Sequence, residues 1–294
     1  MAERYTRRRI GDRSDGRRLR TLAPVFQLTP FLMRSPGDAR LTFTDQADLT
    51  AVEQWVRTRR EEGNEDVSVM HVFIAAYVRT LALCPAMNRF VAGRFLYARD
   101  RIDIVLSSGG SGSADAGSQN VKVRFLPTDT VYDVCRKIRA QVDSIKADEE
   151  ASRIERAASV LVRTPRFVLR LATGVLRFLD YHGLLSETWT DRSPFHGTAV
   201  ISDEGASGLP PVSRSLNSLG CLPLSLSIGR SRTATEAGPM GEKREVRYAD
   251  YTVSLDCRIA DTAYIGTAFR YFRYYLANPG ELELNPERVN EDTL

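Results

Sequence analysis

A cysteine and an aspartate lie four positions apart in the stretch Ser254-Leu-Asp-Cys-Arg-Ile-Ala-Asp-Thr-Ala-Tyr264. The residues from Val246 to Leu255 alternate as in a strand, and those from Thr262 to Ala277 have helical spacing. A thiolate is a good nucleophile when a neighbouring cation lowers its pKa, and Arg258 directly follows the cysteine, although adjacent strand residues point to opposite faces. Cys257 therefore either does chemistry or fills a small buried space.

The elements that must position this stretch alternate irregularly between helices and strands. Further helices are predicted over Ala51–Glu62, over Val69–Cys84 with Ser68 as its cap, and from Pro127 to about Ala151. Strands are expected at Leu41–Thr44, Phe95–Tyr97, Ile102–Leu106, Val121–Phe125, Phe195–Ser202 and Leu222–Ile228, with extended chain at Leu22–Met33 and a turn region at Arg230–Glu242. No GxGxxG follows a strand. The pattern indicates an α/β fold with a mixed sheet rather than a doubly wound nucleotide-binding fold.

Length and composition fit a globular protein with a sizeable core, at 294 residues and 43% hydrophobic content. We expect one domain over residues 21–283, preceded by a basic N-terminal arm at 1–20 and followed by a polar tail at 284–294 that frays. Within the domain, residues 107–120 are rich in glycine and serine and predict a flexible loop. This loop lacks the lysine of a phosphate-binding loop.

The four cysteines, at positions 84, 135, 221 and 257, form no CxxC pair. Their spacing fits reduced thiols and suggests neither a zinc site nor a disulfide framework, so no metal cofactor is expected. The N-terminus has no apolar signal-peptide core, and nowhere do eighteen uncharged apolar residues follow one another. We therefore expect a cytoplasmic protein.

The segment 157–185 combines many Val, Leu and Phe residues with Arg163, Arg166, Arg170 and Arg177. It predicts a basic amphipathic helix, or two helices split at Pro165. One interpretation is a helix that makes peripheral contact with a membrane or binds a partner, and the other is a helix packed over the core with its arginines in water. Eight arginines within the first twenty residues could neutralise phosphates, but no recognition helix or aromatic platform accompanies them, so no nucleic acid partner is expected.

Five stretches together carry a family resemblance. They are Gly11-Asp-Arg-Ser-Asp-Gly-Arg-Arg-Leu-Arg20, Val69–Arg79, Pro85–Arg99, Ser193-Pro-Phe-His-Gly197 and the junction at Ser254–Thr262. The chain resembles the catalytic domain of the dihydrolipoamide acyltransferases of 2-oxoacid dehydrogenase complexes, and more distantly chloramphenicol acetyltransferase. It is most similar to free-standing bacterial members without a lipoyl domain. The resemblance spans about Arg9 to Leu282, and the Pro85–Arg99 block is its most specific part.

The resemblance implies a mixed sheet flanked by helices, assembled as a homotrimer with active sites between neighbouring subunits. It also implies acyl-CoA as a substrate and an acceptor of unknown identity. In the family, the histidine of a His-x-x-x-Asp-Gly motif is the general base that deprotonates the acceptor. Here Cys257 stands in the place of that histidine, Asp261 is kept, and Thr262 replaces the glycine. The family's aspartate is an ion-pair or hydrogen-bond anchor, for which Arg8, Arg9 and Arg13 are candidate partners.

The resemblance also implies a hydroxyl that stabilises the oxyanion, with Ser202 the first candidate and Thr198 the second. Loss of the base is expected to cost about 10²- to 10⁴-fold in rate, whereas an oxyanion donor alone supplies about 3–4 kcal/mol. Where free-standing relatives have a His-His pair after Pro-Pro, this chain has Val212-Ser-Arg-Ser-Leu, so no nearby histidine substitutes. Two hypotheses follow. The protein is a CoA-dependent acyltransferase with altered chemistry at Cys257, or an inactive acyltransferase-fold protein that binds CoA or an acyl ligand, or serves as an oligomeric scaffold.

Overall fold

A six-stranded mixed sheet forms the centre of the computed structural model, which describes residues 9–108, 119–147, 164–237 and 243–292. Its strands lie in the order β2 (Arg40–Asp48), β9 (Lys243–Asp256), β8 (Leu224–Ala237), β7 (Ala199–Asp203), β5 (Ile102–Ser108) and β6 (Gln119–Phe125). β7 runs parallel to both of its neighbours, and the other pairs are antiparallel. The predicted mixed sheet is therefore confirmed.

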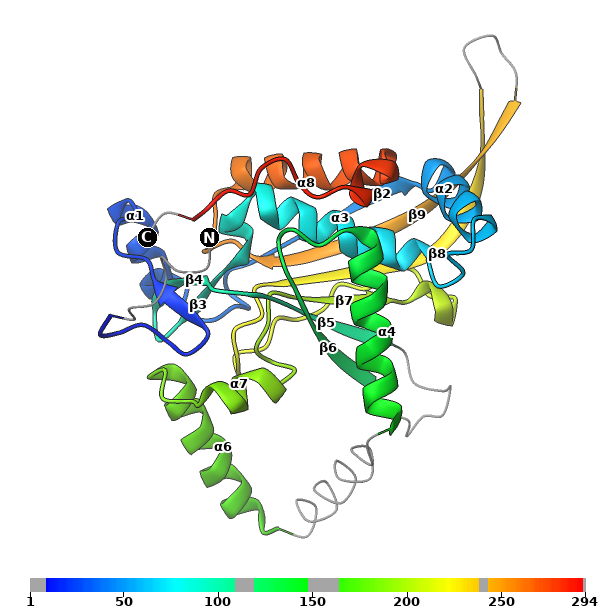
Figure 1. Ribbon diagram of the computed structural model, residues 1–294. Coiled ribbons are helices and arrows are strands. Elements are labelled where there is room, and N and C mark those ends of the chain that lie inside the picture. The colour runs from blue at the N-terminus through cyan, green and yellow to red at the C-terminus, as the bar shows by residue number, and fades with distance from the viewer. Residues whose placement is uncertain (1–8, 109–118, 148–163, 238–242, 293–294) are drawn as a thin grey trace.

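Helices cover one face of this sheet (Figure 1). They are α2 (Thr50–Glu61), α3 (Val69–Leu83), α4 (Val131–Ala147) and α8 (Thr262–Ala277). Apolar side chains of alternate strand residues, such as Ile201, Leu226 and Val253, pack with these helices in the main core. Because α3 lies in the middle of this layer, it is apolar around most of its circumference, and Ser68 caps its N-terminus together with the His71 side chain.

A smaller sheet and two helices complete the described structure (Figure 1). The strands β1 (Gly16–Arg18), β4 (Phe95–Arg99) and β3 (Arg89–Ala92) form the three-stranded sheet. The helices α6 (Arg166–Tyr181) and α7 (Glu187–Arg192) lie on the opposite side of the large sheet from α3 and α8. No helix in the described ranges has the length and apolar character needed to cross a membrane.

The helices and strands predicted near the Cys257 junction are confirmed. The helix expected at Thr262–Ala277 has those bounds, and the strand before it begins slightly earlier, at Lys243. The neighbouring prediction of a turn region at Arg230–Glu242 is wrong for its first half. There β8 continues to Ala237, paired with β9 in a hairpin that reaches beyond the sheet (Figure 1), and residues 238–242 lie outside the described residues.

The extended chain predicted at Leu22–Met33 is also wrong, because Pro24–Leu32 forms helix α1. Pro24 occupies the first turn of this helix. A backbone N–H at this position would have no partner within the helix, so proline's lack of one costs no hydrogen bond. The polar tail, which we expected to fray, is docked as far as the structure describes it. The backbone N–H of Asn290 donates to the carbonyl oxygen of Ala82, and Asp292 pairs with Arg89.

Three other predicted segments fall partly outside the described residues. Of the basic arm at 1–20, residues 9–20 are described and contain β1, which pairs with β4. Of the loop predicted at 107–120, the described ends belong to strands β5 and β6. Of the segment 157–185, residues 157–163 are outside, and α6 begins directly after Pro165, where a split was predicted.

Candidate functional site

Cys257 lies in the turn between β9 and α8, beside the C-terminal end of α1. Its backbone N–H donates to the carbonyl oxygen of Ala39 over 2.8 Å, and its Sγ lies 3.9 Å from Sδ of Met33. Its side chain is partly exposed, whereas the other three cysteines of the chain are buried. Cys257 is therefore the thiol that solvent reaches most easily.

The surroundings of Cys257 favour a neutral thiol. Burial raises the pKa of the thiol, the charge of Asp256 raises it further, and the charge of Arg258 only partly opposes these effects. Arg258 is itself buried and donates from Nε to Asp256 over 2.8 Å, so its charge is largely neutralised by that carboxylate. Its Nη1 donates to the carbonyl oxygen of Met33. Arg258 is held in a structural ion pair, and Cys257 is protonated at neutral pH, so it neither accepts a proton nor acts as a good nucleophile there.

We expect iodoacetamide at pH 7 to alkylate Cys257 more slowly than a cysteine in an unstructured peptide. The rate should rise until the pH exceeds the ordinary thiol pKa of about 8.5. Mass spectrometry of the alkylated protein over a pH series measures this rate. Cys257→Ala should remove nearly all of the labelling, because the other three cysteines are buried. A half-maximal rate below pH 8 would show instead that Arg258 activates the thiol.

Asp261 is the N-terminal cap of α8. Its carboxylate accepts a hydrogen bond of 2.7 Å from the backbone N–H of Tyr264, and its side chain is exposed. A cap of this kind contributes about 1 kcal/mol to stability. Arg13, one of the candidate partners, instead pairs with Asp15 and Asp180, and Arg8 lies outside the described residues. The structure thus places Asp261 as a hydrogen-bond anchor at the helix start.

Ser202 and Thr198, the two oxyanion candidates, differ in their hydrogen bonds. The Ser202 side chain on β7 is 1% exposed, and its hydroxyl has no hydrogen-bond partner among the described residues. The Thr198 hydroxyl accepts from the backbone N–H of Asp103 over 3.1 Å. A buried hydroxyl without a partner costs about 1–3 kcal/mol, so a hydrogen bond from Ser202 to a ligand oxygen would remove this cost. Ser202 is the better placed of the two.

Ser202 belongs to a face of the large sheet that carries hydroxyl side chains, opposite the helix-covered face. Ser107, Ser202, Ser227 and Thr252 are consecutive register partners across β5, β7, β8 and β9, and all four are buried. Partners in register point to the same side of a sheet. We call this side the hydroxyl face. The backbone N–H of Val212 donates to the Ser227 hydroxyl, so the chain after β7 crosses the hydroxyl face.

A single chain does not bring Ser202 and Cys257 together. Ser202 pairs in register with Ser227 of β8, which pairs in register with Thr252 of β9. Cys257 lies five residues after Thr252. At about 3.3 Å per residue and about 4.8 Å per strand spacing, the two side chains are about 17 Å apart along the strands and about 10 Å apart across them. No reacting group can contact both residues of one chain.

A buried ionic cluster was not predicted from the sequence. Arg13 donates to Asp15 over 3.0 Å and to Asp180 over 2.9 Å, and Arg99 donates to Asp15 over 3.3 Å and to the carbonyl oxygen of Cys221 over 3.0 Å. Its side chains are all less than a tenth exposed. The cluster joins the Gly11–Arg20 and Pro85–Arg99 stretches, whose closely spaced arginines and aspartates were its only signal in the sequence. It fastens α6 to the small sheet.

His196 continues this cluster. Its Nε2 lies 3.1 Å from Asp180 Oδ1, and its Nδ1 lies 2.9 Å from the Ser193 hydroxyl. This order of serine, histidine and aspartate is also that of a hydrolytic triad. His196 is only 2% exposed, however, and Asp180 also accepts from the backbone N–H of Gly220 and pairs with Arg13. The histidine is therefore a link between α6 and the chain before β7.

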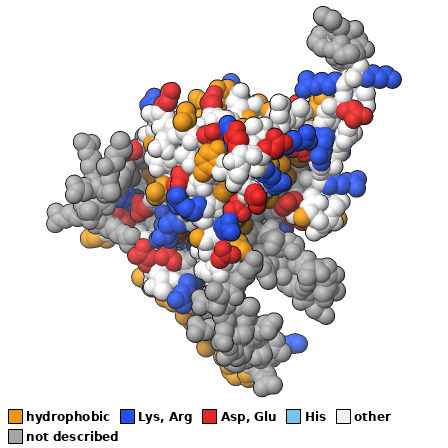
Figure 2. Space-filling model, turned by 45° about the vertical axis from the view of Figure 1, so that its right-hand side comes forward, with side chains coloured by type: hydrophobic (Ala, Val, Ile, Leu, Met, Phe, Trp, Pro, Cys, Tyr) orange, Lys and Arg blue, Asp and Glu red, His pale blue; other side chains and the backbone are white. Residues whose placement is uncertain are grey.

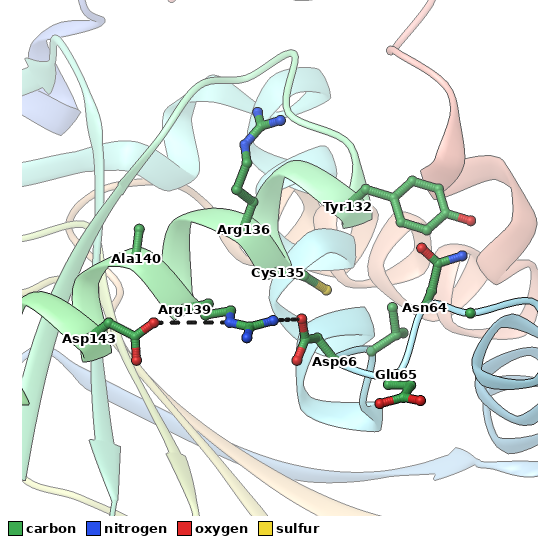
Figure 3. A pocket seen from close by; sticks show the side chains of 11 residues that line it. Asn64, Glu65, Asp66, Tyr132, Cys135, Arg136, Arg139, Ala140 and Asp143 are labelled. Atoms are coloured by element: carbon green, nitrogen blue, oxygen red, sulfur yellow. Dashed lines mark hydrogen bonds and ion pairs between the residues drawn. The ribbon is translucent and has the colours of Figure 1, made fainter.

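Two surface pockets lie away from both Cys257 and Ser202. The larger, of about 620 Å³, lies between α4 and residues 63–67, where Arg139 is paired with Asp66 and Asp143 (Figure 3). Burial raises the pKa of Cys135 at its wall to about 12, so this thiol is unreactive at neutral pH. The smaller, of about 170 Å³, lies between α1 and β4. Within the described ranges, no group of His, Cys, Asp and Glu side chains could hold a metal ion.

Comparison with solved structures identifies the fold. The chain superimposes on a probable dihydrolipoamide acetyltransferase from Listeria monocytogenes with a TM-score of 0.54 and 13% identity, covering 94% of this chain and 97% of that one. It superimposes on the cubic core of a pyruvate dehydrogenase multienzyme complex with a TM-score of 0.56 and 13% identity, covering 88% and 89% of the two chains. No family model matches the chain, and the comparison with curated proteins gives no match.

A third structure is the dihydrolipoamide acetyltransferase of Azotobacter vinelandii, with a TM-score of 0.54, 13% identity and coverage of 88% and 89%. It was determined to study the role of a serine, a histidine and an asparagine in the catalytic mechanism of that enzyme, the last two being four positions apart. The fold of the present chain is thus an acyltransferase fold. More narrowly, it is the fold of the catalytic cores of 2-oxoacid dehydrogenase acyltransferases, as the sequence resemblance predicted.

Proposed function

We propose that the protein binds acyl-CoA between neighbouring subunits of a homotrimer, and that it transfers the acyl group slowly because Cys257 does not replace the missing base. The observation that carries this proposal is the Ser202 hydroxyl, which is buried and has no partner among the described residues. A hydroxyl held in this way can donate to the oxygen of the acyl carbonyl as negative charge develops on it. The Thr198 hydroxyl accepts from Asp103 and donates to the carbonyl oxygen of Arg101 over 3.5 Å, so it would have to give up the latter bond.

The positions of the site residues support an assembly of several copies. Ser202 and Cys257 are too far apart in one chain to contact the same reacting group, but Ser202 of one copy and Cys257 of a second copy can meet between the two subunits. In the sequence, Ser202 comes first and is followed by Cys257 and Asp261, which are four positions apart. In the Azotobacter enzyme that order belongs to residues of the catalytic mechanism. We therefore assign Ser202 of one subunit and Cys257 of its neighbour to each site.

The chemistry of Cys257 sets the expected rate. A general base works best when its pKa lies near the working pH, whereas burial and Asp256 raise the pKa of this thiol. Transfer should therefore be slower by about 10²- to 10⁴-fold than with a histidine base. Ser202 still stabilises the oxyanion, so a residual rate should remain above the uncatalysed reaction.

Titration calorimetry with acetyl-CoA, together with chromatographic measurement of released CoA in the presence of a small thiol or amine acceptor, tests this function. We expect saturable binding and slow release. Ser202→Ala should lower the residual rate by about 10²-fold or more with little change in the dissociation constant. The matched control is Ser225→Ala, which removes another buried hydroxyl without a described partner on the same face, and it should leave the rate within about threefold.

Two further results would decide against parts of the proposal. Lack of saturable binding of acetyl-CoA would exclude a CoA-dependent function and leave only the scaffold hypothesis. Loss of turnover in Cys257→Ser would show that the thiol itself accepts the acyl group. The homotrimer is checked by light scattering of the purified protein, in which a monomer would contradict a site shared between subunits.

A further inference from the structure

Helix α6 exposes a stripe of large apolar side chains. Phe167, Leu171, Val175 and Phe178 are spaced by three or four residues and are 73%, 68%, 49% and 58% exposed. Residues at this spacing lie on one side of a helix. α6 reaches away from the large sheet at the lower end of the molecule in Figure 1, where Figure 2 also shows hydrophobic side chains at the surface. Burial of this stripe needs something outside the described structure.

The charged residues of α6 are distributed asymmetrically. Arg166, Arg170 and Arg177 are exposed, and at about 100° per residue they fall within about 40° of one another on the helix. None of the carboxylates in the described part of the chain lies within ion-pair distance of these three arginines. The single acidic residue of the helix, Asp180, is buried and bonded to Arg13 and His196. The exposed surface of α6 is therefore apolar on one side and purely basic on another.

A third side of the helix faces the protein. Leu169, Leu176 and Leu179 are half-buried, and at about 100° per residue they lie on a third side of the helix, apart from both the arginines and the apolar stripe. At its C-terminal end, α6 is tied to the body of the protein through Asp180 and the ionic cluster. The helix is thus held in one orientation while its apolar stripe stays outward.

The apolar surface continues past the end of the helix. Tyr181 at the end of α6, Leu184 after it and Trp189 of α7 are all about half exposed or more. Tyrosine and tryptophan favour the level of lipid headgroups, because their rings are apolar and their edges are polar. This composition of Phe, Leu, Trp and Tyr beside arginines is typical of helices that lie in a membrane surface.

We propose that α6 docks the protein onto the surface of a lipid bilayer that contains anionic lipids. The apolar stripe enters the boundary between headgroups and acyl chains, and Arg166, Arg170 and Arg177 meet the negative headgroups. A second copy of the helix fits less well, because it would bring unpaired arginines together. This docking is independent of the proposed acyl-CoA site.

Sedimentation with lipid vesicles tests the proposal on the full chain. We expect the protein to sediment with vesicles of phosphatidylcholine and phosphatidylserine, and about a hundredfold less with phosphatidylcholine alone. The double variant Phe167→Ser and Phe178→Ser should lower binding by about tenfold or more. Arg170→Gln together with Arg177→Gln should weaken the preference for phosphatidylserine by about fivefold for each arginine.

The matched control is the double variant Val25→Ser and Leu32→Ser, which removes two exposed apolar side chains from α1. It should bind vesicles like the original protein. Circular dichroism and acetyl-CoA titration show whether each variant keeps its fold and its ligand site. The proposal is overturned if the original protein sediments with neither vesicle. It is also overturned if the phenylalanine variants change the molar mass in solution but not vesicle binding, since the stripe would then be a contact between copies.

Discussion

Replacing Cys257 by histidine is expected to raise the rate of acetyl transfer by about 10²-fold or more. The backbone at this position is already held by the bond to Ala39, and the side chain is partly exposed and lies beside the Met33 sulfur. An imidazole has a pKa of about 6.5, so it is largely unprotonated at pH 7.5 and can accept the proton of a thiol acceptor. The Cys257 thiol has a raised pKa and is therefore protonated at this pH, so it cannot accept that proton.

Steady-state kinetics of CoA release compares Cys257→His with Cys257→Ala. The alanine variant is the control, because it removes the thiol without adding a base, and its rate should stay near that of the original protein. Adding Ser202→Ala to the histidine variant should remove most of the gain, since the base and the oxyanion donor act on the same transition state. If histidine and alanine at position 257 give equal rates, the channel does not hold the reacting groups.

Replacing Asp15 by asparagine is expected to lower the free energy of unfolding by about 3–5 kcal/mol. Asp15 is 1% exposed and is the carboxylate shared by Arg13 and Arg99, so its loss leaves both buried cations with less compensation. Urea unfolding followed by circular dichroism measures the change. The control is Asp250→Asn, which breaks a more exposed pair with Arg232 and should cost about 1 kcal/mol or less. Equal costs would show that the ionic cluster does not hold the fold.

The same carboxylate predicts how stability depends on pH. Burial of Asp15 raises the pKa of its carboxyl, but the charges of Arg99 and Arg13 outweigh it and hold that pKa well below its usual range. A carboxyl with a depressed folded-state pKa stabilises the protein fully above its unfolded value of about 3.9 and loses this effect as the pH falls towards the folded value. The original protein should therefore lose stability below about pH 4 more steeply than Asp15→Asn does.

Helices that begin with a capping residue could be predicted from the sequence, because the cap and the helix are adjacent in the chain. The helix at Thr262–Ala277 follows a capping aspartate, and α3 follows a capping serine, so both were located well. The strand β8 beyond Ile228 was missed because its residues are polar on both sides where the hairpin leaves the sheet, and no alternation marks them. Helix α1 was missed because two prolines within twelve residues suggested extended chain.

The candidate site was located only by resemblance, and its geometry depends on contacts between distant residues. The position of Cys257 followed from the motif, but the neutralisation of Arg258 by Asp256 is a property of the folded turn. The unpartnered state of Ser202 and its distance from Cys257 depend on the pairing of β7, β8 and β9, which are far apart in the sequence from β5. The ionic cluster joins residues as far apart as Arg13 and Asp180, so no spacing rule could have predicted it.

A structure of the protein with bound CoA tests the central claim most directly. We predict three copies around a threefold axis, with the CoA sulfur within about 4 Å of Cys257 Sγ of one subunit and of Ser202 Oγ of its neighbour. A CoA sulfur that contacts neither residue, or a single copy with no neighbouring subunit beside the hydroxyl face, would contradict the shared site.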